Sequence, residues 1–146
     1  MTLNKDEIVL HWAMQNPYLT DALLMGHLAQ RQGACAIIPL PVPGGGAVKR
    51  YINGDQISRY DFMLQVMFAM SETTDSVNTD NLFTQRQWMD WIDEQEQNKN
   101  YPDFGPDCGS YELRNMAGGP QMAQIFEDGM AKYQFPATII YLERKG

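Results

Sequence analysis

Residues 59–70 are the segment that most restricts the possible folds of this chain. One set of alternating side chains is apolar, Tyr60, Phe62, Leu64, Val66, Phe68 and Met70, and the other set is mixed, Arg59, Asp61, Met63, Gln65 and Met67. A period of two is typical of a strand that is buried on one face. We therefore expect a long strand with one face on the core and a mixed face elsewhere.

Turn signals divide the rest of the chain into short elements. Asn53-Gly54 and Asp128-Gly129 are typical of β-hairpins, and the prolines and glycines of residues 39–46 exclude a helix there. We expect helices at 4–15, 16–28 and 78–98, and strands at 34–39, 48–52, 59–70, 111–116, 121–126 and 131–141. This order predicts one α+β domain over residues 1–146, with helices packed on one face of an antiparallel sheet.

The charge balance argues against a nucleic-acid-binding protein. The 146 residues include 18 acidic and 11 basic side chains, which gives a net charge of -7. Such a chain repels a phosphate backbone, and its basic residues are scattered singly. No run of about 18 apolar residues and no signal peptide occur, so we expect no membrane span and a chain that stays in the cytoplasm where it is made.

The residue types that usually carry chemistry do not form a recognised motif. Cys35 and Cys108 are not part of a CxxC pair, and His11 and His27 lack ligand spacing to any Cys or carboxylate. The glycines at 44–46 are not followed by the Lys-Ser/Thr of a phosphate loop. We expect no metal, no cofactor and no catalytic residue.

The carboxylates of the chain have a simpler interpretation than catalysis. Four of them, Asp90, Asp93, Glu94 and Glu96, crowd one predicted helix on the side opposite Met89 and Ile92. A solvated acidic helix face accounts for them. Glu127-Asp128 is interpreted as part of a turn.

Methionines on the mixed face of the long strand suggest an interaction surface. A monomer would be expected to carry polar groups at Met63 and Met67, and methionine often lines surfaces that bind partners. The candidate subunit-interface residues are therefore those of this face, Arg59, Asp61, Met63, Gln65 and Met67.

The order of several stretches resembles a known family. A leading helix with Trp12 precedes a Pro/Gly loop, Tyr-Ile-Asn-Gly at 51–54 and Arg-Tyr-Asp-Phe-Met-Leu-Gln-Val at 59–66. Gln-Trp-Met-Asp-Trp-Ile follows at 87–92, and Phe-Glu-Asp-Gly-Met-Ala-Lys-Tyr-Gln-Phe-Pro-Ala-Thr-Ile-Ile-Tyr-Leu-Glu at 126–143. Over most of its length the chain resembles the minor capsid and tail terminator family of long-tailed, non-contractile bacteriophages.

The resemblance implies a ferredoxin-like subunit that closes into a hexameric ring. Such a ring caps the head-proximal end of the tail tube, binds the tail tube protein and the head-tail connector or stopper protein, and lets DNA pass without sequence-specific binding. It implies a place in the tail and neck of the virion, assembled in the bacterial cytoplasm. The candidate loops for contacts with neighbouring rings are Pro41, Pro43, Gly45, Thr73 and Asp75.

Two other interpretations remain open from the sequence. One is a different neck component, a connector or stopper, which would also be small, acidic and oligomeric. The other is a small ligand-binding or enzymatic α+β domain, for which Arg59, Tyr60, Asp61 and Glu127 are the first candidates. A pocket with converging polar groups would favour that alternative.

Overall fold

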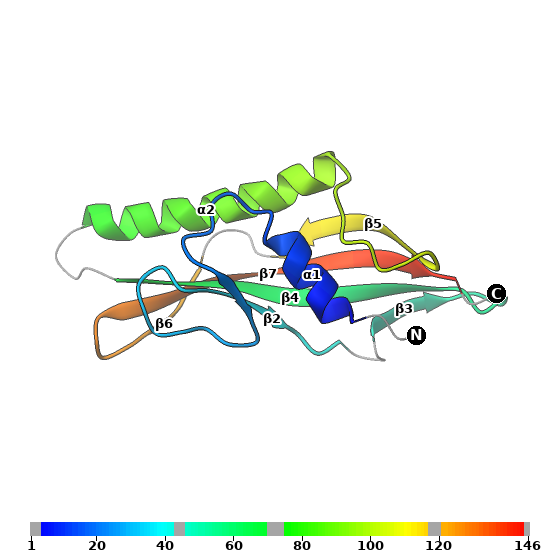
Figure 1. The fold of residues 1–146 in the computed structure, drawn as a ribbon, viewed down its shortest axis with the longest axis horizontal. Helices are drawn as coiled ribbons and strands as arrows, with labels where there is room; N and C mark the ends of the chain where they lie inside the picture. The colour runs from blue at the N-terminus through cyan, green and yellow to red at the C-terminus, as the bar shows by residue number, and fades with distance from the viewer. Residues whose placement is uncertain (1–3, 43–45, 70–74, 117–120, 145–146) are drawn as a thin grey trace.

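The computed structural model describes residues 4–42, 46–69, 75–116 and 121–144 of the chain. Two helices and seven strands are formed in the order α1 (Lys5–Ala13), β1 (Leu23–Met25), β2 (Cys35–Pro39), β3 (Ala47–Arg50), β4 (Gln56–Ala69), α2 (Asp75–Gln97), β5 (Cys108–Asn115), β6 (Gln121–Ile125) and β7 (Met130–Glu143) (Figure 1). The chain is thus of the α+β class.

The strands of the described residues form one sheet in the order β1-β2-β4-β7-β5, with β3 also paired to β4 and β6 also paired to β7. Its centre is the antiparallel pair of β4 and β7, which are matched along their whole length from Gln56↔Glu143 to Ala69↔Met130. Since β7 occupies one side of β4 throughout, β2 and β3 share the other side, and β5 and β6 share the outer side of β7. The sheet therefore has one edge formed by β1 and β3 and another formed by β5 and β6.

The alternation predicted for the two long strands is confirmed. Phe62, Leu64 and Val66 of β4 are buried, as is the apolar side of β7, Ala131, Tyr133, Phe135, Ala137, Ile139 and Tyr141. Burial of these residues on one face supplies the main stabilising contribution to the fold, because it removes their apolar surface from water.

Both helices cover this same face, as predicted. Trp12 of α1 meets Phe62 with 6.3 Å between ring centroids and Trp91 of α2 with 5.1 Å, so it joins both helices to the sheet. Trp88 is fully buried, and its indole N–H donates to the carbonyl oxygen of Tyr18. In Figure 1, α2 runs along the length of the two central strands and α1 crosses them.

The helix predicted at 16–28 is wrong. The Oδ1 atom of Asn16 accepts a hydrogen bond from the N–H of Tyr18, which forms a local turn instead of a helical cap. Leu23–Met25 is strand β1 and pairs parallel with β2, and Gly26, at φ 76°, donates its N–H to the carbonyl oxygen of Ile37. The sheet is consequently mixed and not wholly antiparallel, because pairing with β2 satisfies this backbone better than an isolated short helix would.

The long helix extends beyond its predicted start. It begins at Asp75, where a polar loop was expected, and ends at Gln97. No helix in the described ranges is long and apolar enough to cross a membrane.

Candidate interaction surface

The five candidate interface residues lie on the sheet face opposite the helices, which we call the open face. Arg59, Asp61, Met63 and Gln65 alternate along β4 with the buried side chains and are half-buried. Their partners on β7 are Ile140, Thr138, Pro136 and Gln134, in that order. The side chains that the sequence grouped together are therefore neighbours on one surface, which in Figure 1 lies on the side of the sheet away from α2.

Met67 differs from the other candidates. It is only 2% exposed, although its side chain belongs to the same set as that of Met63. Its N–H donates to the carbonyl oxygen of Ala34, and its own carbonyl oxygen accepts from the N–H of Gly33. The turn before β2 is thus held against this end of β4, and Met67 is part of the interior of the subunit.

An apolar row crosses the open face at its centre. Ile38 of β2 pairs with Met63, and Met63 pairs with Pro136. The row continues to Met116, whose N–H donates to the carbonyl oxygen of Pro136 and whose side chain is 54% exposed. Side chains opposite one another on adjacent strands are in contact range, so these residues form a continuous apolar band.

Polar ladders lie on both sides of the apolar row. On one side Gln65 Nε2 donates to Gln134 Oε1 at 3.0 Å. On the other side the Thr138 hydroxyl donates to Asp61 at 2.5 Å, and Arg59 Nε lies 3.4 Å from the second oxygen of Asp61. An apolar centre surrounded by hydrogen-bonded polar side chains is typical of a protein-protein interface.

The open face is not the acidic side of the molecule. By their strand pairing, its charged side chains are Lys49, Arg59, Asp61, Glu112, Arg114 and Lys132. Four are basic and two acidic, whereas the whole chain carries -7. The acidic excess includes Asp90 and Glu94, which are exposed on α2. Asp93 is also exposed on α2, but its Oδ1 accepts a hydrogen bond from Asn115 Nδ2 of β5 at 2.8 Å.

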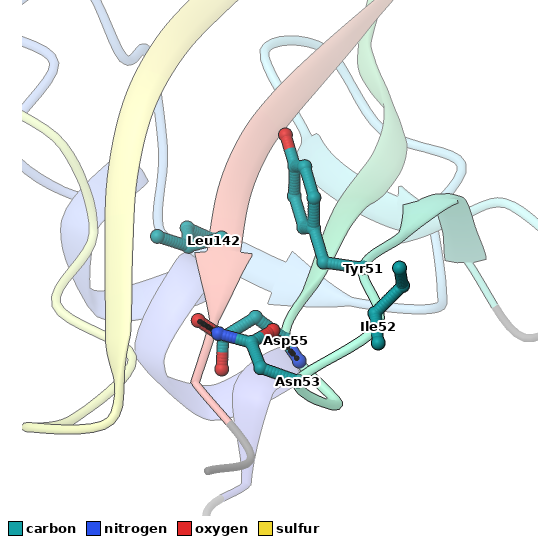
Figure 2. Close-up of a pocket in the computed structure, with 5 residues that line it drawn as sticks. All are labelled: Tyr51, Ile52, Asn53, Asp55 and Leu142. Carbon is teal, nitrogen blue, oxygen red and sulfur yellow. Dashed lines mark hydrogen bonds between the residues drawn. The ribbon is translucent and has the colours of Figure 1, made fainter.

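A hollow of about 600 Å³ opens beside the hairpin between β3 and β4 (Figure 2). Its walls are the side chains of Tyr51 and Leu142, with Ile52 at the exposed hairpin tip. Asn53 Nδ2 donates to Asp55 at 3.2 Å, and Asn53 Oδ1 accepts from the N–H of Asp55. Its polar side chains thus bond to one another within the turn, and the walls suit an apolar side chain of a partner.

The candidates for catalysis do not converge. Arg59 and Asp61 lie on the open face, whereas Tyr60 points to the helix side and donates to Asp6 at 2.5 Å. Burial, followed by this bond to Asp6, raises the pKa of Tyr60 well above its usual range. Glu127 lies in the turn between β6 and β7, at the far end of β4 from Arg59. Tyr60 is therefore separated from Arg59 and Asp61 by the alternation of side chains along β4, and Glu127 is separated from all three by the length of the strand.

The remaining predicted positions are placed as follows. Pro41 is exposed in the loop after β2, and Asp75 is the first residue of α2, so its prediction as a loop residue is wrong. Pro43, Gly45 and Thr73 lie outside the described residues. Cys35 is buried and Cys108 is half-buried, and no disulfide joins the two. Among the described residues no three His, Cys, Asp or Glu side chains gather as a metal site would require.

Glu96 has a structural role that the prediction of a solvated acidic face missed. Its Oε2 accepts from the N–H of Leu113 at 2.7 Å and from the hydroxyl of Tyr101 at 3.0 Å. The Tyr101 hydroxyl also donates to the carbonyl oxygen of Tyr111. Burial, and then the bond to Glu96, raises the pKa of Tyr101 to about 12. Glu96 and Tyr101 together cap the outer edge of β5.

Comparison of the chain with models of known protein families and with curated proteins gives no match.

Proposed function

We propose that this chain is the tail terminator of a long-tailed, non-contractile bacteriophage, with a ferredoxin-like fold of the tail-terminator type. It is a structural, non-catalytic subunit that forms a ring, most simply a hexamer, at the head-proximal end of the tail tube. The ring stops tail polymerisation and joins the tail to the neck connector. The sequence resemblance over most of the chain suggests this role.

The observation that carries the proposal is the open face. Helices of the same chain cover one side of the sheet, while the other presents Ile38, Met63, Pro136 and Met116 between polar ladders. An apolar patch with a polar rim on a small protein marks an interaction surface. A neighbouring subunit that packs there buries the apolar row and leaves the ladders at the rim.

Ring closure also needs two different surfaces on each subunit, because each copy contacts one neighbour on either side. The sheet offers two unlike edges, one of β1 and β3 and one of β5 and β6. The hollow at Tyr51 and Leu142 and the exposed loop at Pro41 are further places for contacts along the tail axis.

Deletion of the gene from a phage that encodes this chain tests the function. We expect full heads together with tails of uncontrolled length, or heads and tails that remain separate, in electron micrographs of lysates. Addition of the purified protein to isolated tails should restore joining, whereas a connector or stopper would instead bind the portal side of the head. Joined particles with tails of normal length after deletion would contradict the proposal.

A further inference from the structure

Two edge strands lie at the same level on opposite sides of the sheet. Leu24 of β1 pairs with Ala36 of β2, which pairs with Gln65 of β4. Gln65 in turn pairs with Gln134 of β7, the partner of Gln121 in β6. β1 and β6 are therefore the two ends of one row across the sheet.

The directions of these two strands are opposite. β1 is parallel to β2, and each of the three following pairs, β2-β4, β4-β7 and β7-β6, is antiparallel. A second copy placed beside the first in the same orientation thus brings its β1 antiparallel to β6 of the first. No shift along the strands is needed, and antiparallel strands pair well.

The backbone of β6 is open to such a neighbour. Within the described ranges, β6 pairs with β7 alone, and its residues from Met122 to Ile125 are exposed. The N–H of Phe126 donates to Met130 inside the hairpin, so the preceding N–H, that of Ile125, points outward. Ile125 itself is 51% exposed.

The backbone of β1 is also open to a neighbouring chain. In the described part of the chain β1 pairs only with β2, and the N–H of Gly26 donates inward to Ile37. The N–H of Met25 therefore points away from β2. By contrast, Glu96 and Tyr101 cap β5, which shares the edge with β6. This contrast selects β6 over β5, because an uncapped edge strand readily pairs with another chain.

We propose that β6 of one copy pairs antiparallel with β1 of the next, so that a continuous sheet runs around the ring. The partner is a second copy of this chain, and the inference rests on the proposed ring. The contact joins two different surfaces, as a closed ring requires, and it is separate from the open face.

A disulfide cross-link between two copies tests the edge contact directly. Leu24→Cys with Gln121→Cys, in a Cys108→Ser background, places one cysteine at each end of this row, where the proposed contact brings them opposite one another. Within one copy they are roughly 19 Å apart, four strand spacings, and a disulfide needs under about 7 Å. Oxidation should therefore give a ladder of covalent multimers, whereas Leu24→Cys with Arg114→Cys, on capped β5, should give none.

The outcomes separate the two proposals. A wild-type protein that is monomeric at every concentration contradicts the ring and the edge contact together. A wild-type ring that gives no ladder from the cysteine pair overturns the edge contact and leaves the ring standing. A ladder from the cysteine pair supports the contact.

Discussion

At the scale of a single residue, the sequence pattern indicated that Glu96 faces inward, although the acidic residues of this helix were interpreted as a solvated face. It follows Ile92 by four positions, so it lies on the same side of the helix as a fully buried residue. That spacing was a signal for an inward-facing carboxylate. Which groups it would meet, the N–H of Leu113 and the hydroxyl of Tyr101, depends on tertiary packing that no local pattern specifies.

Substitution of Glu96 by Ala should destabilise the fold. The N–H of Leu113 would lose its partner at a partly buried edge, which costs about 1–3 kcal/mol of the free energy of unfolding. Glu94→Ala, on the exposed side of the same helix, is the control and should change it by less than about 0.5 kcal/mol. Equal midpoints of the two variants in urea denaturation would refute the role of Glu96.

Tyr101 gives the protein a specific sensitivity to alkaline pH. Its pKa is about 12 in the folded protein against an ordinary 10.0, so between these values the unfolded chain loses a proton that the folded chain keeps. Stability should therefore fall as pH rises through this window. Tyr101→Phe lacks this contribution, and we expect a shallower slope of the free energy of unfolding against pH between 10 and 12. An unchanged slope would contradict the shift.

Gly46 has a conformational role that composition alone did not reveal. Its φ is 96°, and a Cβ atom there would lie 2.9 Å from the carbonyl oxygen of Arg59. Gly46→Ala should therefore cost about 1–3 kcal/mol in thermal or urea unfolding. Gly109→Ala, which meets nothing within 4 Å, is the control and should be nearly neutral. If Gly46→Ala leaves the free energy of unfolding unchanged, residue 46 does not approach the carbonyl oxygen of Arg59 as closely as the structure shows.

At the scale of the elements, periodic patterns correctly predicted the long strands, because the local sequence defines them. They did not predict the short strand that forms only by pairing with a distant segment. The alternation in β4 and β7 is a local property of the chain and is confirmed, and Met89 and Ile92 of α2 are buried. Leu82, which has the same apolar spacing along α2, is 37% exposed. The segment around Leu23 has a helix-like apolar spacing, but it pairs with Cys35 and its neighbours as a three-residue strand. Such a short strand has too few residues to show a period, so only its partner defines it.

Met63 on the open face of β4 provides the test of the proposed interface at this scale. Met63→Asp places a charge in the apolar row between Ile38 and Pro136. Because Met63 is half-buried in the subunit, its loss should lower the free energy of unfolding only modestly. A neighbouring subunit that packs on this face would have to remove water from the new carboxylate, which opposes assembly. We expect the concentration at half-assembly to rise at least tenfold, measured by analytical ultracentrifugation. If Met63→Asp assembles at the same concentration as wild type, the open face is not part of the interface between subunits.

At the scale of the whole molecule, the proposed assembly role is supported by the resemblance and by the surfaces that the sheet leaves exposed. The order of helices, hairpins and Trp-bearing segments resembles that of a ring-forming subunit. The sheet then separates a helix-covered face from an open one, and an uncapped edge from a capped one. These surfaces arise from the pairing of distant segments, and for that reason residue patterns alone did not identify β1, β6 or Met116 as contact candidates.

The mass of the purified protein in solution tests the central claim most directly, namely that these surfaces hold copies of the chain together. Light scattering across a hundredfold range of concentration should give one closed species, at about 100 kDa for six copies of the 16.7 kDa chain. Electron microscopy of the same sample should show rings of uniform diameter. A constant mass of one chain over the whole range would contradict the account.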